Sequence, residues 1–451
     1  GVTHISGRHV VLGAGARPFV PPYPGLMDVD FHTSDTVMRL EALPERMLIF
    51  GGGYIAAELG HVFSAFGCEV TMVNRGDRLL RREDEDVAQR FTELMSRRFD
   101  VRCGAEVIKV ERPSGDDARG WGTRVTDDTT TMFMTMNRNK KSITIDMKTS
   151  EGRSQMQSLM MGADIFLHNM RPGSLVNLGL DSTSVRNKFP SVIYCDIGAF
   201  GHLGPLKDQP GYEPLMQAYG GLVSINGHPD GPVARIAVSL IDIGTGMWTA
   251  IGALAALHNR HKTGKGCTIN TSLYETALAW GNYHMAEYHM TGEVPVRQAS
   301  GHPAVVPYQA FDGADGRFMI LAGNDRLFEK LAHVLGQPEW VQDTRYKTNQ
   351  DRVKNRDELI EAVQAIVCKG PRKAWVEKLQ AAGVPSAPIQ TIPEVLETPQ
   401  TKALDILEDV PGTTLKLVGM PVSFNGKRPI MRTLPPRLGS SNQDFSVTNK
   451  D

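Results

Sequence analysis

A long apolar segment that contains one acid and ends in a basic turn places the strongest constraint on this fold. Residues 233–277 read VARIAVSLIDIGTGMWTAIGALAALHNRHKTGKGCTINTSLYETA. The pattern predicts an extended apolar stretch, a helix over about 246–260 that is buried on most sides, and a β-segment over 267–273. Asp242 falls where the extended stretch meets the helix. An acid there is either a helix N-cap, for which Asp is favoured, or a candidate nucleophile.

The composition is that of a globular enzyme with several cores. The 451 residues carry 49 Lys and Arg against 50 Asp and Glu, so a nucleic-acid or membrane-surface partner is not expected. No apolar run looks long enough to span a bilayer, which needs about 18 residues, and no signal peptide is visible. The five cysteines form no CxxC pair. We therefore expect a cytoplasmic protein with reduced thiols, no metal and no membrane partner.

A strand, a glycine-rich turn and a helix follow one another near the N-terminus. Gly51-x-Gly53-x-x-Ala56 stands between the apolar segment 47–50 and a predicted helix over 54–66. Glycines in this context let a backbone approach a pyrophosphate at the helix N-terminus. The alternative is a glycine turn that only tightens the strand-to-helix connection.

The second predicted strand, 69–73, ends in basic residues where NAD-binding domains usually carry an acid. Arg75 and Arg81 would suit a ribose 2′-phosphate, so NADP is the expected ligand of this fragment. A solvated basic loop before the acidic run 83–86 remains the alternative.

Three stretches, GAGARP, HTSDTVMRL and GGGYIAAELGHVFSAFG, carry a family resemblance over residues 2–101. This region resembles the pyridine nucleotide-disulfide oxidoreductases, and within them the mycothione reductases. Complete enzymes of that family also need an FAD-binding glycine motif, a redox-active cysteine pair and a dimerisation domain with a catalytic His. The sequence shows none of these, so we do not expect a reductase.

The character of the sequence changes between Asp100 and Gly104. The segments 67–75 and 104–112 share the frame G-x-E-V-x-x-V-x-R, and both look like the second strand of a βαβ unit, but the later copy lacks its preceding strand and helix. The seam is either a natural domain fusion or, as we favour, the joining of two incomplete genes. We divide the chain into an oxidoreductase fragment (1–103), a large domain (104–300), a smaller α+β domain (301–400), and a return to the large domain with a C-terminal tail (401–451).

After the seam, predicted strands and helices alternate. A predicted helix over 151–161 is followed by a strand over 165–167, the loop 168–173 and another strand over 192–196. This order predicts an α/β fold with a doubly wound, mainly parallel sheet.

Motifs over 104–438 carry a second resemblance: VIKVERPSGDDARGWG, NRNKKSITIDMKTSEG, HNMRPG, SLIDIGTGMW, and LHNRHKTGKG with TSLYETAL. They are similar to the class III CoA-transferase family, which contains formyl-CoA transferase, carnitine CoA-transferase and alpha-methylacyl-CoA racemase. The resemblance implies an interlocked homodimer. It also implies that Asp242 forms an aspartyl-CoA intermediate while CoA moves from an acyl-CoA donor to a free carboxylic acid.

By motif match the resemblance also implies a coenzyme A and acyl site. Its residues are Arg112, Asp146, Met147, Lys148, Asn169, Met170, Arg171, Tyr212, Glu213 and Gly301. For the charged members, a solvated surface position is the alternative. The sequence departs from formyl-CoA transferase at Asn177, where that enzyme has a CoA-binding arginine.

Two rival functions remain open. Racemases of the family use a His base in the loop that here carries Tyr212, and tyrosine is a poor base at neutral pH, which favours transfer over racemisation. The other rival is a non-catalytic chimera with NADP- and CoA-binding remnants. Because the family's strand, turn and helix before GAEVIKVER are replaced here, we expect weak CoA binding and low transferase activity.

Overall fold

The computed structural model describes residues 18, 20, 29–74, 78–80, 83–98, 100–103 and 106–445. Arg75, Arg81 and Gly104 lie outside them, so the basic part of the expected NADP site is not described. The chain divides into two compact units, one of residues 1–109 and 139–141 and one of residues 110–138 and 142–451. Each is described by itself.

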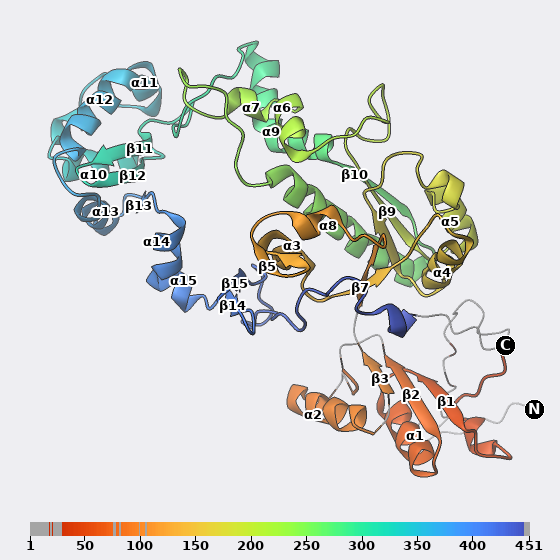
Figure 1. Ribbon diagram of the computed structural model, residues 1–451. Helices are drawn as coiled ribbons and strands as arrows, with labels where there is room; N and C mark the ends of the chain where they lie inside the picture. The colour runs from red at the N-terminus through yellow and green to blue at the C-terminus, as the bar shows by residue number, and fades with distance from the viewer. Residues whose placement is uncertain are drawn as a thin grey trace, which may run out of the picture. The chain divides into compact units, whose positions relative to one another are not determined.

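The first unit is a three-stranded parallel sheet with two helices (Figure 1). Its elements are η2 (Val37–Arg39), β1 (Arg46–Phe50), α1 (Tyr54–Ala65), β2 (Glu69–Asn74), α2 (Glu85–Ser96) and β3 (Asp100–Cys103). The strand order is β1-β2-β3, and Arg46 pairs with Glu69. Val70 and Met72 are buried with Phe63 of α1, whereas Leu48 and Phe50 are more than half exposed. The predicted strand–turn–helix–strand order is confirmed.

The larger part of the second unit alternates strands and helices. Its elements are β4 (Val107–Glu111), η3 (Asp117–Gly120), β5 (Arg124–Thr126), β6 (Thr129–Thr130), α3 (Thr131–Asn137), β7 (Lys140–Thr144), α4 (Ser150–Met161), β8 (Ile165–His168), η4 (Val176–Leu178), α5 (Ser182–Lys188), β9 (Ile193–Gly198), α6 (Glu213–Tyr219), α7 (Leu222–Ile225), α8 (Leu240–Thr263), β10 (Thr268–Ser272) and α9 (Leu273–Thr291). A parallel sheet runs in the order β10-β9-β8. Ala253 and Ala256 of α8 pack against Ile193 and Cys195 of β9. The predicted α/β fold class is therefore confirmed.

A smaller α+β part follows. Its elements are β11 (Tyr308–Gly313), β12 (Gly316–Leu321), α10 (Asp325–Val334), η5 (Pro338–Val341), α11 (Asn349–Lys354), α12 (Arg356–Val367), α13 (Arg372–Ala381) and β13 (Ser386–Pro388). The chain continues with α14 (Ile392–Glu397), α15 (Pro399–Ala403), β14 (Leu407–Asp409), β15 (Lys416–Val418) and η6 (Asn442–Phe445). Strands β11, β12 and β13 form an antiparallel sheet whose buried face packs on α10, η5, α12 and α13. Arg352 is fully buried there, donating to Val306 O and Tyr346 O and pairing with Asp325.

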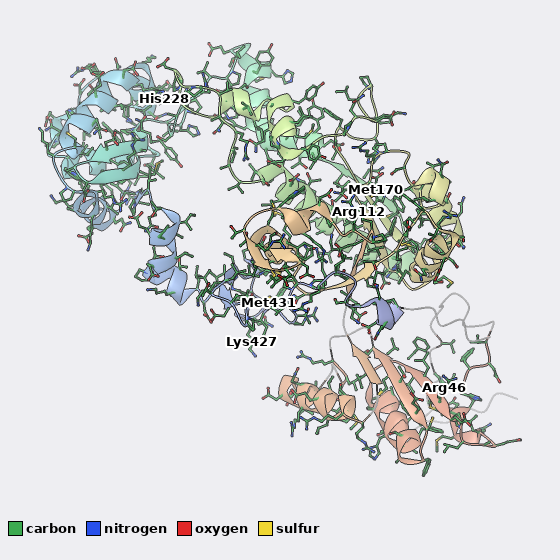
Figure 2. The ribbon with its side chains drawn as sticks, in the orientation of Figure 1. Arg46, Arg112, Met170, His228, Lys427 and Met431 are labelled. Atoms are coloured by element: carbon green, nitrogen blue, oxygen red, sulfur yellow. The ribbon has the colours of Figure 1, made fainter. Side chains whose placement is uncertain are left out.

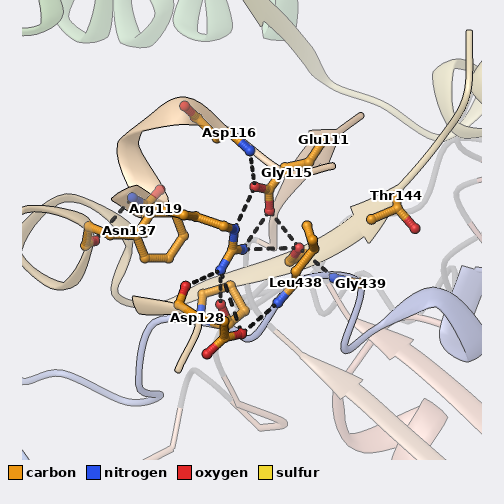
Figure 3. Close-up of polar contacts among 12 residues, drawn as sticks. Glu111, Gly115, Asp116, Arg119, Asp128, Asn137, Thr144, Leu438 and Gly439 are labelled. Atoms are coloured by element: carbon orange, nitrogen blue, oxygen red, sulfur yellow. Dashed lines mark hydrogen bonds and ion pairs between the residues drawn. The ribbon is translucent and has the colours of Figure 1, made fainter. Parts of the chain in front are cut away.

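The C-terminal segment is tied to β4 and β7 through a buried ion pair (Figure 3). Arg119 Nη2 lies 2.6 Å from Glu111 Oε1, and both side chains are almost completely buried. Ser142 Oγ donates to the same oxygen of Glu111 at 2.6 Å and accepts from Gly439 N–H at 3.1 Å. Leu438 N–H donates to Asp128 Oδ2. Buried charges need such partners. One polar network therefore joins two segments, 111–142 and 438–439, that are distant in sequence.

Candidate active site

Asp242 is the third residue of α8, not its N-cap. Among the described residues the N-cap is Ser239, which makes no capping bond with its own side chain. The helix begins at Leu240, six residues before the predicted start, and residues 233–238 form no strand. The prediction of a strand-to-helix junction was wrong here because the apolar pattern before Asp242 belongs to a loop and a first helical turn.

Glu213 caps α8 from a neighbouring helix. Its Oε2 accepts from the Asp242 N–H at 2.7 Å, and its Oε1 accepts from the Ile241 N–H at 3.2 Å. Gln217 Nε2 donates to Glu213 Oε1 at 2.7 Å, and the Glu213 side chain belongs to the buried core. These are the backbone groups that an N-cap side chain normally satisfies, and an anion at this end of a helix is favourable. Glu213 therefore fixes the turn that carries Asp242.

The same contact tunes Asp242. Partial burial, together with the negative charge of Glu213, raises the pKa of the Asp242 carboxyl above its usual range. The residue nevertheless remains exposed in the single chain, so its carboxylate can reach a substrate. A more basic carboxylate is a better nucleophile, and this arrangement suits covalent catalysis.

Close packing between α8 and α9 holds the site. A Cβ added to Gly244 would lie 2.8 Å from Trp280 Cζ2, so the helices approach where α8 has no side chain. The hydroxyls of Thr245 and Thr276 lie 2.8 Å apart across the same contact. Further along α8, the Thr249 hydroxyl lies 2.8 Å from that of Thr271 on β10, the strand that leads into α9.

An aromatic pair involves Tyr283, which lies about one turn further along α9 than Trp280. The Tyr283 ring stacks on that of His302, with centroids 6.3 Å apart and planes 23° apart. His302 directly follows Gly301, whose N–H donates to Gln298 O. Arg356 of α12 donates to His302 O at 3.0 Å and to Pro303 O at 2.7 Å, and so holds this loop.

The predicted coenzyme A residues lie on three loops of the larger part. Asn169, Met170 and Arg171 are exposed after β8, and Met170 and Arg171 line a hollow of about 110 Å³ with His168, Pro172, Gly173, Leu175, Val176, Asp181, Ser182, Tyr194 and Asp196. Figure 2 labels Met170 and Arg112, which stand on separate elements. Arg112 Nε donates to Gly115 O, and its guanidinium pairs with Asp117.

The segment 146–148 forms a tight turn before α4. Asp146 Oδ1 accepts from the Lys148 N–H at 3.0 Å, and Arg153 donates to Met147 O and Lys148 O. A Cβ at Gly152 would lie 2.0 Å from Asp146 O, so only glycine fits there. The turn leaves the side chains of Asp146 and Lys148 exposed, while Met147 is half-buried.

Tyr212 and Glu213 have opposite surroundings although they are adjacent in sequence. The Tyr212 side chain is 71 % exposed at the start of α6, whereas Glu213 is buried beneath α8. Only Tyr212 is therefore free to face a substrate directly. Glu213 acts on the site through the backbone of α8.

The glycine turn of the first unit has the shape that the sequence predicts. Gly51 adopts φ +120°, and Gly53 is the N-cap of α1, which carries Ala56 in its first turn. A Cβ at Gly52 would lie 2.6 Å from Asn74 Cγ, and Gly52 O accepts from the Leu80 N–H at 2.6 Å. The turn is thus closely covered by the segment that follows β2.

The prediction that α8 is buried on most sides was wrong. Its exposed large apolar residues are Ile243, Met247, Trp248, Ile251 and Leu254. Residues 240–260 also form one helix long and apolar enough, by length and composition alone, to cross a membrane, contrary to the sequence expectation. A core helix passes the same test. Among the described residues, no group of three or more His, Cys, Asp or Glu could hold a metal ion.

Sequence reasoning missed the contacts between α8 and α9 next to Asp242. They join Thr245 of α8 to Thr276 of α9, and Gly244 of α8 to Trp280 of α9. A weak signal was available, because Thr245 and Thr249 are polar residues one turn apart within an apolar helix. Both hydroxyls also bond to the preceding turn of α8.

A parallel α/β sheet and an exposed carboxylate on a helix that packs against it are the main features of the candidate site. Residues 101–442 match the model of CoA-transferase family III, and the chain belongs to that family. It is accordingly a class III CoA-transferase, with CoA transfer as its general activity. Residues 1–148 match the model of pyridine nucleotide-disulphide oxidoreductases. Both predicted resemblances are confirmed.

Named relatives and solved structures agree with this assignment. The chain is 35 % identical to acetyl-CoA:oxalate CoA-transferase of Acetobacter aceti over 72 % of this chain and 83 % of the relative. It is 33 % identical to human succinyl-CoA:glutarate CoA-transferase over 74 % and 78 %. A CAIB/BAIF family protein from Brucella suis has a TM-score of 0.68 and 34 % identity over 76 % of this chain and 92 % of that one. Rv3272 from Mycobacterium tuberculosis gives 0.69 and 29 % over the same shares.

Proposed function

We propose that this protein moves CoA between an acyl-CoA and a free carboxylic acid through an aspartyl-CoA intermediate on Asp242. The supporting observation is the exposed Asp242 carboxylate, held on a helix turn by Glu213 and made more basic by that neighbour.

The reaction is two symmetric exchanges. The Asp242 carboxylate attacks the thioester carbonyl, breaks the C–S bond and releases CoA thiolate, which leaves a mixed anhydride. The thiolate attacks the aspartyl carbonyl and expels the donor carboxylate, giving aspartyl-CoA. The acceptor carboxylate repeats the two steps in reverse, so Asp242 is regenerated and no net proton or electron is needed. We propose that backbone N–H groups of a glycine-rich loop stabilise the oxyanion.

The substrates that we propose are dicarboxylic. The relatives reported above are named for oxalate, glutarate and succinyl-CoA. Coenzyme A itself would contact Arg112, the 146–148 turn and the 169–171 loop, whose cations and amides suit its phosphates.

A homodimer is part of the proposal. The large apolar residues Ile243, Met247, Trp248, Ile251 and Leu254 of α8 are exposed in the single chain, and exposed apolar patches commonly mark protein–protein interfaces. A second copy of this chain would cover these residues, and size-exclusion chromatography with light scattering would show one particle of twice the chain mass. A particle of a single chain mass would contradict this. We also keep the cytoplasm as the proposed location.

The first unit offers a second, separate binding function. Its glycine turn at the start of α1 supports NADP binding. Titration of the full chain with NADPH should give a saturable fluorescence change, and a flat titration would reject it.

The transferase assay uses succinyl-CoA as donor and glutarate as acceptor, with formation of glutaryl-CoA measured by mass spectrometry. Asp242→Asn should lose at least about a thousandfold in rate, because the carboxylate forms the intermediate. Asp357→Asn is the matched control, since Asp357 is also exposed in the first turn of a helix. Equal activity of Asp242→Asn and wild type would refute the mechanism.

A further inference from the structure

His168 ends β8 immediately before the 169–171 loop and takes no part in the transfer steps. Its Nε2 lies 2.7 Å from the Tyr194 hydroxyl, and its Nδ1 lies 3.3 Å from the Met170 backbone nitrogen. The imidazole side chain is about 10 % exposed. It therefore connects the buried sheet to the loop that we assign to coenzyme A.

The neighbours allow only one form of the ring. The Tyr194 hydroxyl donates its hydrogen to the Leu180 carbonyl at 2.9 Å, because a carbonyl can only accept. The Tyr194 oxygen must therefore accept a hydrogen bond from the Nε2–H of His168. The Met170 backbone N–H can only donate, so His168 Nδ1 must be unprotonated. Both contacts therefore select the neutral imidazole with its proton on Nε2.

The charges around the ring come from several elements. Asp196 Oδ1 on β9 lies 3.8 Å from His168 Nδ1, and His202, in the following loop, lies 3.8 Å from the other oxygen of Asp196. Asp181 at the start of α5 and Arg171 in the loop complete the lining of the hollow. Burial lowers the pKa of His168, the charge of Asp196 opposes this, and His202 reinforces it.

A proton on Nδ1 would have two effects. It would face the Met170 N–H as a second donor and remove that hydrogen bond. It would also draw the ring toward Asp196, the nearest acceptor on that side. Because burial holds the pKa of His168 down, the ring stays neutral at neutral pH and the bond to Met170 is lost only as the solution becomes acidic.

We propose that His168 is a positioning residue for coenzyme A binding: neutral His168, oriented by Tyr194, fixes the 169–171 loop, and its protonation releases the loop. This rests on the proposed placement of coenzyme A at that loop. The affinity for CoA is then full at neutral pH and falls as His168 takes up a proton.

Two amide variants, each of which reproduces one ring nitrogen, separate the roles of the two nitrogens. His168→Asn keeps an acceptor near the Nδ1 position and cannot titrate. His168→Gln keeps a donor near the Nε2 position and loses the acceptor for Met170. Free CoA is titrated by calorimetry at pH 7.5 and pH 5.5. Variants are compared at each pH because the phosphate of CoA itself titrates near pH 6.

At pH 7.5 His168→Gln should bind CoA about five- to tenfold more weakly than wild type, the effect of one lost hydrogen bond, while His168→Asn stays close to wild type. At pH 5.5 wild type should bind CoA more weakly relative to His168→Asn than it does at pH 7.5. His202→Gln, which touches Asp196 but not the loop, should keep the wild-type dependence on pH in direction. A His168→Gln affinity equal to wild type, or a His168→Asn variant with the full wild-type pH dependence, overturns the proposal.

A second measurement does not need CoA. Hydrogen exchange of the Met170 amide in the wild-type protein, corrected for the intrinsic rate, should lose protection as the pH is lowered from 7.5 to 5.5. Unchanged protection overturns the role of His168. If wild type shows this loss of protection but binds no CoA, the coenzyme A assignment fails while the His168 contact stands.

Discussion

Glu213→Gln is the substitution that best tests how the site is held. The carboxylate accepts three N–H groups, from Ile241, Asp242 and Gln217, and it is buried. A glutamine keeps one acceptor oxygen and turns an NH₂ group toward at least one of these donors. One charge-assisted hydrogen bond contributes about 1.5–3 kcal/mol, and an anion at a helix N-terminus about 0.3–1 kcal/mol. We expect the variant to lose about 2–4 kcal/mol of stability.

The same substitution should shift the acid limb of the kcat/KM profile to lower pH. A simple loss of stability would shift that limb to higher pH. The charge of Glu213 helps to raise the pKa of Asp242, so its removal lowers that pKa and Asp242 ionises at lower pH. The acid limb of kcat/KM for succinyl-CoA should therefore shift to lower pH, while the rate at neutral pH falls because the first turn of α8 is less well fixed.

Urea unfolding followed by circular dichroism measures the stability, and rates between pH 4 and pH 8 measure the limb. Glu377→Gln is the charge control, because that carboxylate is 66 % exposed and its ion pair with Lys373 is long at 3.9 Å. This substitution should change the free energy of unfolding by less than about 0.5 kcal/mol. If Glu213→Gln behaves like this control and leaves the acid limb in place, the capping role is refuted.

Three further predictions concern packing, acid stability and specificity. Gly244→Ala should destabilise the protein by about 1–3 kcal/mol, seen in the same urea unfolding, because its Cβ would meet Trp280 at 2.8 Å. Burial opposes ionisation of Glu111, but hydrogen bonds from Arg119, Ser142 and a backbone N–H outweigh the burial and lower the pKa of Glu111. The stability that ionised Glu111 contributes is therefore present above the ordinary glutamate pKa and is lost as the pH falls through the lowered pKa. The hydrogen-exchange protection around residue 439, corrected for the intrinsic rate, should therefore fall in acid, and Glu111→Gln should remove that pH dependence. His302→Ala should lower kcat/KM for succinyl-CoA about tenfold and leave butyryl-CoA within twofold; an equal loss for both would show that His302 does not read the second carboxylate.

Local patterns predicted much of the secondary structure. The first unit follows its sequence closely, since alternating apolar residues, a glycine turn and a helical pattern coincide with β1, α1 and β2. The start of α8 was placed six residues too late. The reason is that its true N-terminus carries no capping side chain of its own, and Glu213 supplies the cap from 29 residues earlier in the chain. No local pattern contains that information.

The candidate site divides in the same way. Motif matches identified Asp242 and the loop 169–171, because these residues lie in short stretches with a specific order. They did not find Thr276, which meets Thr245 only because α9 packs against α8, nor His168, whose role depends on Tyr194 from the adjacent strand.

The sequence by itself determined the family, the α/β order of elements and the identity of the candidate nucleophile, because these depend on residue types at close spacing. Only the tertiary structure decided that Asp242 stands inside the first turn of α8, that Glu213 faces the helix and not the solvent, and that one side of α8 is exposed. Each of these depends on contacts between residues far apart in the chain. Such contacts set burial, capping and pKa, and they exist only once the helices are packed.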